Sequence, residues 1–317
     1  MEYLETFFAP FSFLLDPEKR IYWFYLLTSL IAASLVTSFH QKGFNAAQQI
    51  KALLNANYWL NRSTALDVVL LFTNSVIRLT LLIPFFGSRL VTTILVGSFL
   101  QTNVADSPSF DVPWYLIAIL FSVTFFVTED LSRFGLHLLM HRVNFLWVLH
   151  KVHHSATNLT PLTLFRVHPL ESIFYFIRGL IVFGLVSGVF VWLFGSKVNA
   201  LHILGVDLFG FIFAAVASNL RHSRLWLSFG KLEAVFISPA QHQLHHSKHH
   251  DHPNYGTCLA LWDNFFNSLE KTTLRKPEKE LVFGLADHPA QQPLTYLKAH
   301  QENGQHLNPV IRTGSSF

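Results

Sequence analysis

The chain contains very little cysteine: Cys258 is the only one in 317 residues. A single cysteine excludes an internal disulfide, and it also excludes a metal site built from several thiolates. A metal site with several ligands in this protein must therefore be built mainly from nitrogen or oxygen ligands.

Charged residues are also scarce. They make up 13% of the chain, whereas apolar residues make up 51% and phenylalanine alone contributes 32 residues. This charged share is about half of what is usual in soluble domains, and the mean hydropathy is +0.35. A soluble enzyme of this length needs more charge to cover its surface, so the composition indicates an integral-membrane protein. The net charge of +4 comes without Lys/Arg runs, which argues against a nucleic-acid surface.

Long apolar runs supply the candidate membrane spans. Residues 21–39 form the first run, with aromatic residues at its start, where a membrane interface would lie. A second run covers about 66–100 and is interrupted by Pro84 and Gly87, which leaves open one span plus a re-entrant piece or a tight hairpin. We predict an all-α polytopic protein with about four to six transmembrane helices. The remaining runs are 113–128, 173–194 and 200–218.

The distribution of basic residues predicts the orientation, because cytoplasmic loops carry an excess of Lys and Arg. The loop 101–112 is acidic and is expected outside. The histidine-rich segments are then expected to form a helical cap on the cytoplasmic side, in a bacterial inner membrane or, for a eukaryotic chain, in the endoplasmic reticulum membrane. The basic residues that flank the spans on this side are Arg133, Arg142, Lys151, Arg166, Arg221, Arg224 and Lys231.

Two segments are rich in histidine. The first contains HLLMH and HKVHH within residues 130–154, and the second contains HQLHH at 242–246. On a helix, His-x-x-x-His places two rings one turn apart on one face, and His-x-x-His-His does the same for its first and last histidines. The eight histidines of these boxes are His137, His141, His150, His153, His154, His242, His245 and His246.

This number of imidazoles exceeds the four protein ligands of a structural zinc site, so the pattern favours two metal ions. Iron, copper, nickel and zinc all fit an all-nitrogen ligand set. The hydrolase patterns HExxH and HxxEH are absent. A dinuclear iron centre that activates O2 accounts for the number of ligands and suits an apolar substrate delivered from the bilayer.

In order and spacing, these boxes resemble the histidine boxes of the fatty acid hydroxylase superfamily, which includes the sterol desaturases. Asp130 before the first box, the segment His168-Pro169-Leu170-Glu171, and Asn254-Tyr255-Gly256 followed by Leu261-Trp262-Asp263 are similar to that family's pattern as well. The similarity covers about residues 113–270, and the segment 223–247 resembles prokaryotic sterol desaturase family proteins. We therefore divide the chain into a membrane-anchoring region (1–112), a catalytic domain (113–270) and a cytoplasmic tail (271–317).

The resemblance implies that the eight box histidines bind metal, together with His168 and His222, which match further histidines of the family pattern. Carboxylates often orient ligand rings through the second ring nitrogen. Asp130 lies two turns from His137 on the same helical stripe, and we expect it to orient that ring in a catalytic role. Glu171 and Asp263 are further candidates for this role, with plain surface acids as the alternative.

The resemblance also implies a function. It predicts a non-haem di-iron oxygenase with two iron ions that uses O2 to hydroxylate or desaturate a fatty acyl chain or a sterol-like lipid. Because the sequence has no GxGxxG or haem-attachment motif, electrons are expected from a partner such as a reductase, a ferredoxin or a cytochrome b5-like protein. The alternatives are a membrane protein that binds zinc or copper, and a zinc hydrolase; few polar residues within the spans argue against a metal carrier. We assign His249, His250 and His252 to a solvated loop.

Overall fold

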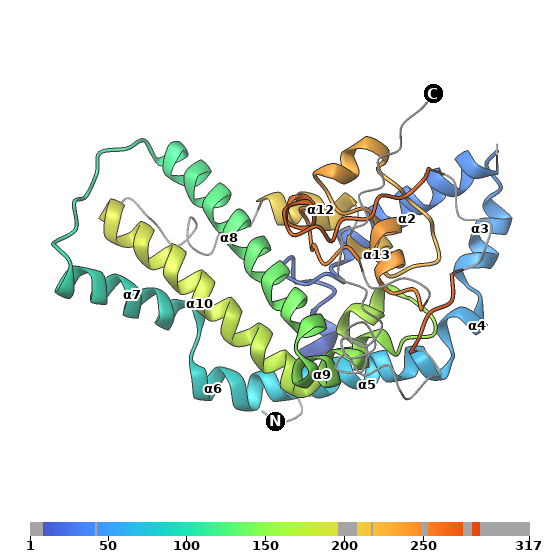
Figure 1. Ribbon diagram of the computed structural model, residues 1–317, viewed down its shortest axis with the longest axis horizontal. Helices are drawn as coiled ribbons and strands as arrows, with labels where there is room; N and C mark the ends of the chain where they lie inside the picture. Colours follow the sequence, from blue (N-terminus) through green and yellow to red (C-terminus); the bar gives the residue numbers. More distant parts are fainter. Residues whose placement is uncertain are drawn as a thin grey trace, which may run out of the picture.

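The computed structural model describes residues 9–41, 43–195, 208–216, 218–248, 253–274 and 281–285. These residues form helices joined by loops (Figure 1). A helix satisfies its own backbone hydrogen bonds, as a segment within lipid requires. The predicted all-α class is confirmed.

The N-terminal helices begin with α2 (Trp23–His40), which matches the first predicted span. Two short helices follow, α3 (Ala46–Leu53) and α4 (Ala56–Trp59). Their start is fixed by asparagine side chains, since Asn45 and Asn55 each accept a hydrogen bond from the backbone at the beginning of the helix.

The long apolar stretch 62–103 is a chain of shorter helices. It consists of α5 (Arg62–Ile77), the π-helical turn η1 (Arg78–Leu82), α6 (Ile83–Phe86) and α7 (Arg89–Asn103). Gly87 ends α6 with a φ of +83°, a conformation that glycine adopts readily. The interruption expected at this glycine is therefore a helix boundary.

Three helices, α7, α8 (Trp114–Arg142) and α10 (Pro169–Phe194), pack side by side (Figure 1). Phe121 and Phe190 join α8 to α10 at the centre of an apolar core that also contains Ile117. Against α7, α10 presents Gly184 and Gly188, where an added Cβ would lie 2.7 Å from Thr92 Cβ and 2.5 Å from Val96 Cβ. Small residues at this spacing allow two membrane helices to approach closely.

Three segments of the described residues are long and apolar enough to cross a membrane: Arg62–Asn103, Trp114–Arg142 and Pro169–Phe194. The shorter apolar helix Trp23–Phe39 accompanies them. Of the predicted span 200–218, the structure describes α12 (Leu208–Val216) and Ser218, and residues 200–207 and 217 lie outside the described residues. The predicted run 113–128 continues without a break into the first histidine box, because α8 extends to Arg142.

Short helices at one end of this bundle form the histidine-rich cap. In chain order they are α9 (Asn144–His154), η2 (Pro161–Phe165), η4 (Ser218–Leu220), η5 (Gly230–Ala234), α13 (Pro239–His245) and α14 (Leu261–Phe265). A reciprocal capping box starts α13, since the Ser238 hydroxyl accepts from Gln241 N and the Gln241 side chain accepts from Ser238 N.

Buried charges attach the cap to the helices before it. The Arg166 Nε donates to Asp67 Oδ1 on α5 at 2.5 Å, and the Thr163 hydroxyl donates to Asp67 Oδ2 at 2.9 Å. Both Asp67 and Arg166 are buried. This pair fixes the segment between α9 and α10 against α5.

Candidate metal centre

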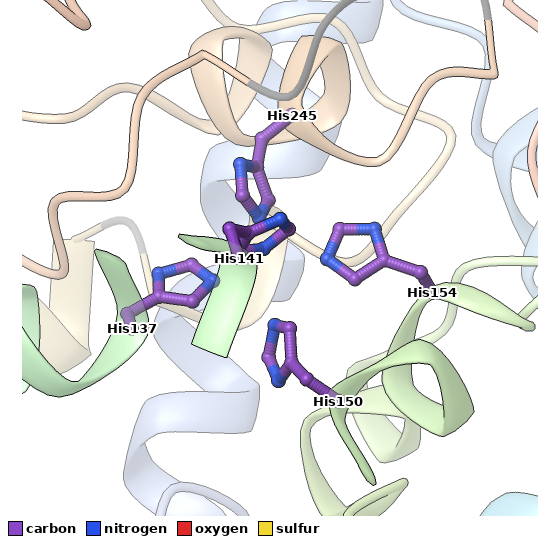
Figure 2. A group of neighbouring side chains, drawn as sticks. All are labelled: His137, His141, His150, His154 and His245. Carbon is purple, nitrogen blue, oxygen red and sulfur yellow. The ribbon is translucent and has the colours of Figure 1, made fainter. Parts of the chain in front are cut away.

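Nine of the predicted ligands gather into two groups. Within each group the ligand atoms lie within 4.8 Å of one another. Figure 2 shows the five rings of the first group arranged around a common centre. His141 is half-buried and the other eight are buried. The first group is His137, His141, His150, His154 and His245, and the second is His153, His222, His242 and His246.

The spacing of the boxes explains this division. Histidines four residues apart share a helical face and fall into the same group, as His150 and His154 do on α9. The histidine between them, His153, points to the second group. On α13 the assignment is reversed, because His242 and His246 belong to the second group and His245 to the first.

Three rings of the first group are oriented by hydrogen bonds at Nδ1, the ring nitrogen that faces away from the centre of the group. His137 Nδ1 donates to Tyr255 O at 2.7 Å, and His245 Nδ1 donates to Pro253 O at 2.8 Å. A carbonyl oxygen only accepts, so the proton lies on Nδ1 and Nε2 presents a lone pair to the group. His150 Nδ1 lies 2.7 Å from Glu171 Oε1, which places Glu171 where an orienting carboxylate was expected.

The second group contains three converging ring nitrogens. His222 Nε2 lies 3.0 Å from His242 Nε2 and 3.2 Å from His246 Nε2. His153 Nδ1 donates to Arg166 O at 3.2 Å, so the Asp67–Arg166 pair also positions this ring.

The rings of the second group are neutral at physiological pH. Burial, followed by the neighbouring histidines, lowers the pKa of His153 to about 3 and lowers the pKa values of His222, His242 and His246 well below 6.5. Neutral imidazole is the form that binds metals. Convergent nitrogen donors therefore fit a metal ion in each group, and those of the second group are also neutral.

The loop that follows α13 supplies the carbonyl for His137. Asn254 has a φ of +63°, and the Asp263 carboxylate accepts from Tyr255 N and Gly256 N, each at 2.7 Å. A Cβ on Gly256 would lie 2.5 Å from Leu259 O. Asp263 therefore acts on His137 through the backbone of this loop rather than by touching the ring.

Asp130 has a different role from the one predicted. Its Oδ1 accepts from Cys258 N at 2.8 Å, and its Oδ2 accepts from Leu259 N and Trp262 Nε1, each at 3.0 Å. The Nδ1 of His137 is already bonded to the Tyr255 carbonyl. Asp130 thus fixes the 258–262 segment and does not orient the His137 ring.

The predicted ligand His168 lies outside both groups. It occupies the N-cap of α10, and its Nδ1 accepts from Leu170 N at 3.2 Å. Pro169 starts the helix directly after it, so the ring bonds to the first turn of α10. His249, His250 and His252 lie outside the described residues.

Several contributors to the site were not predicted from the sequence. The carbonyls of Pro253, Tyr255 and Arg166 carry no residue-type signal, because every residue has one. The Asn-Tyr-Gly segment was noted only as part of a family pattern, and the carbonyl role of Tyr255 follows from the fold.

A cavity of about 700 Å³ opens onto both histidine groups. His137 and His150 of the first group line it, as do His153, His222 and His242 of the second. Helices α5, α8 and α10 contribute much of the remaining wall. A ligand of moderate size in this cavity would lie against both groups at once.

Comparison with known proteins agrees with this geometry. Residues 122–268 match the fatty acid hydroxylase family model, and this range contains all nine clustered histidines. This match confirms the predicted resemblance to that family over residues 122–268. No solved structure gives a significant match.

The curated proteins that this chain resembles are named as enzymes that oxidise lipids. The chain is 26% identical over 218 residues to the alkylglycerol monooxygenase of Caenorhabditis elegans, covering 68% of this chain and 38% of that protein. It is 28% identical over 147 residues to the ornithine lipid hydroxylase OlsE of Rhizobium tropici, covering 44% and 39%. For the Delta(7)-sterol 5(6)-desaturase ERG3B of Gibberella zeae, the identity is 26% over 188 residues, covering 59% and 50%. The chain thus spans less than half the length of the alkylglycerol monooxygenases that it matches.

Proposed function

We propose that this protein is a membrane-bound non-haem di-iron oxygenase that hydroxylates or desaturates a lipid. The observation that carries the proposal is the pair of adjacent groups of buried histidines, both facing one cavity. A single zinc site does not use nine imidazoles. The matched relatives are named as a monooxygenase, a hydroxylase and a desaturase, which favours iron over the other metals that bind imidazole.

The nine clustered histidines would hold the two ions, five in the first group and four in the second. Two bound iron ions would supply O2 activation and the removal of hydrogen from an unactivated C–H bond. The protein fixes the ligand rings, since Tyr255 O, Pro253 O, Arg166 O and Glu171 bond to their second nitrogens.

The cavity would exclude bulk water from the reacting carbon. Phe125 and Leu180 line it between the helices, and Leu164 and Phe165 line it at η2. These apolar parts of the wall suit a hydrocarbon chain and limit side reactions of the activated centre.

The remaining parts of the proposal concern partners and topology. The substrate would reach the cavity from the bilayer, and electrons would come from a separate redox protein such as a reductase, a ferredoxin or a cytochrome b5-like protein. The chain would cross the membrane several times with the histidine cap in the cytoplasm, because basic residues flank the spans on that side.

Metal analysis combined with turnover tests this function. The native protein, purified in lipid nanodiscs after expression with iron, is expected to hold about two irons per chain and to consume O2 with a reductase and a lipid extract. His245→Ala is expected to lose product formation and metal while still inserting into the membrane, because His245 belongs to the first group. His168→Ala serves as the matched control and keeps its metal if that ring stays outside the site.

Stoichiometric zinc without O2 consumption would instead support the hydrolase or metal-binding alternatives. Loss of iron in His168→Ala would restore His168 as a ligand. Full activity in His245→Ala would overturn the assignment of the first group.

A further inference from the structure

The wall of the cavity carries an excess of positive charge. Seven basic residues line it but only three acidic ones. Glu129 bonds to both Arg133 and Arg178 at 2.8 Å, so two guanidinium groups share one carboxylate and one positive charge remains. Glu171 bonds to His150. The bases are Lys19, Arg20, Arg78, Arg89, Arg133, Arg178 and Arg221, and the acids are Glu18, Glu129 and Glu171.

Two of the arginines sit at the interruptions of the apolar stretch 62–103. Arg78 begins the π-turn η1, and Arg89 begins α7. A charged residue within so apolar a stretch is costly and usually serves a function, and π-helical turns are frequent at functional sites. Both arginines line the cavity.

Neither guanidinium group is strongly neutralised. In the described part of the chain, the Arg78 side chain has no hydrogen bond or ion pair, although the carboxylates of Glu18 and Asp16 act on its charge from farther away. Its guanidinium carbon lies 5.9 Å from the centre of the Phe176 ring. Arg89 approaches Glu18 at 3.5 Å, but their side chains are 45% and 53% exposed, and such a pair is worth little. Both arginines are therefore accessible to a ligand.

The α10 residues that Arg78 and Arg89 contact indicate how far each arginine lies from the histidines. Arg78 contacts the ring of Phe176 and Arg89 contacts that of Phe183, whereas Glu171 on the same helix bonds to His150. At 1.5 Å per residue, the two rings lie about 8 Å and about 18 Å along α10 from Glu171. Between Glu171 and Phe183, α10 lines the cavity with the apolar residues Phe176, Gly179 and Leu180 and also with Ser172, Tyr175 and Arg178.

We propose that the cavity binds a lipid with an anionic head group, a phosphate or a carboxylate, held by Arg78 and Arg89, with its hydrocarbon chain extending along α10 to the histidines. Guanidinium groups bind both kinds of anion through paired hydrogen bonds. The inference rests on the proposed function, because it takes this cavity as the substrate site. It predicts oxidation on the chain, away from the head group.

Two lipids that differ only by a phosphate test the head group. Binding of dioctanoyl phosphatidic acid and of dioctanoylglycerol to the metal-loaded protein in neutral detergent is measured by native mass spectrometry. We expect the native protein to bind the phosphatidic acid at least about tenfold more tightly, since one charge-assisted hydrogen bond is worth this much. Arg78→Gln and Arg89→Gln should each remove most of the preference, while Lys231→Gln, an exposed base outside the cavity wall, should keep it.

A second pair of variants tests whether the lipid enters the cavity. An added Cβ at Gly179 would meet no atom within 4 Å, and Gly179 lines the cavity. Gly179→Leu is therefore expected to fold and to occupy part of the space for the chain, lowering the affinity for phosphatidic acid. Gly135 on α8 is equally unobstructed but is not part of the wall, so Gly135→Leu is the matched control. Inorganic phosphate at the same concentration should not displace the lipid.

The outcomes separate this inference from the proposed function. Three results would each overturn the proposal that the cavity binds an anionic lipid. They are equal affinity for the two lipids, unchanged affinity in both arginine variants, and full displacement of the lipid by inorganic phosphate. If the protein gives one of these results and still oxidises a neutral lipid, the proposed oxygenase function stands. Selective, arginine-dependent binding by a protein that consumes no O2 supports the cavity's ligand class and overturns the oxygenase.

Discussion

Glu171 lies at the start of α10, where its buried carboxylate meets the Nδ1 of His150 at 2.7 Å. Replacing it with alanine removes the acceptor that holds this ring toward the first group. Loss of such a partner typically lowers metal affinity about 10- to 100-fold. We expect Glu171→Ala to lose metal on dialysis against a chelator, as measured by the metal content per chain.

Glu171→Gln is the control for this prediction, because its amide oxygen still accepts the hydrogen bond. It should retain more metal than the alanine variant. Equal metal content in the alanine variant and the native protein would show that His150 needs no orienting partner.

Glu233 gives a prediction for the pH dependence of stability. Burial alone would raise its pKa, but hydrogen bonds from Thr272, Ser238 and Ser228 hold it below the ordinary value of 4.5. A lowered pKa stabilises the folded state above about pH 4.5, and this contribution is lost as the pH falls through the lowered pKa. Glu233→Gln should therefore reduce stability at pH 7 by about 1–3 kcal/mol.

Thermal unfolding in detergent at several pH values measures this effect. The difference between Glu233→Gln and the native protein should shrink below pH 4.5. Lys231→Gln, on the same short helix and exposed, should show no such trend. A difference that stays constant with pH would contradict the ionised state of Glu233.

At the scale of elements, the spacing of the boxes is the part of the site that the sequence predicts well. His150 and His154 share a group because residues four apart share a helical face. That rule needs no knowledge of the fold. The assignment of His153 and His245 to the opposite groups does require the fold, because it depends on how α9 and α13 face each other.

Most of the hydrogen-bond partners of the ring nitrogens that face away from the metal groups could not be predicted from the sequence. The partner of His137 was predicted to be Asp130 on the same helix, but it is the Tyr255 carbonyl, more than a hundred residues away. A backbone carbonyl is identical in every residue, so only the folded loop selects it. His168 failed to join the groups for a local reason, since its ring caps the first turn of α10.

The close approach of α7 and α10 gives an element-scale prediction. In Gly188→Leu the new side chain would start 2.5 Å from Val96 Cβ, so the helices must separate. Overpacking of this kind costs about 1–3 kcal/mol. The melting temperature in detergent should fall for Gly188→Leu and stay near the native value for Gly135→Leu, where an added Cβ meets no atom within 4 Å. Equal melting temperatures would mean that α7 does not pack on this glycine.

At the scale of the whole molecule, the orientation of the cap is open to a direct test. Cys258 is buried, and burial raises its pKa to about 12, so it should not react with maleimide. Single cysteines introduced at Asp106 and Lys231, both exposed, then report their side of the membrane. We expect Asp106→Cys to be labelled in intact cells and Lys231→Cys only after permeabilisation. The opposite pattern would place the histidines outside the cytoplasm.

The shared use of α9 and α13 has a consequence for how the protein is loaded. Each of these short helices contributes to both histidine groups, so an ion bound in one group also holds in place the helices that build the other. Binding of the two metal ions should therefore be cooperative. In a titration of metal-free protein followed by native mass spectrometry, chains with no ion and chains with two should outnumber those with one. Protein with a single bound ion should therefore be rare in the cell.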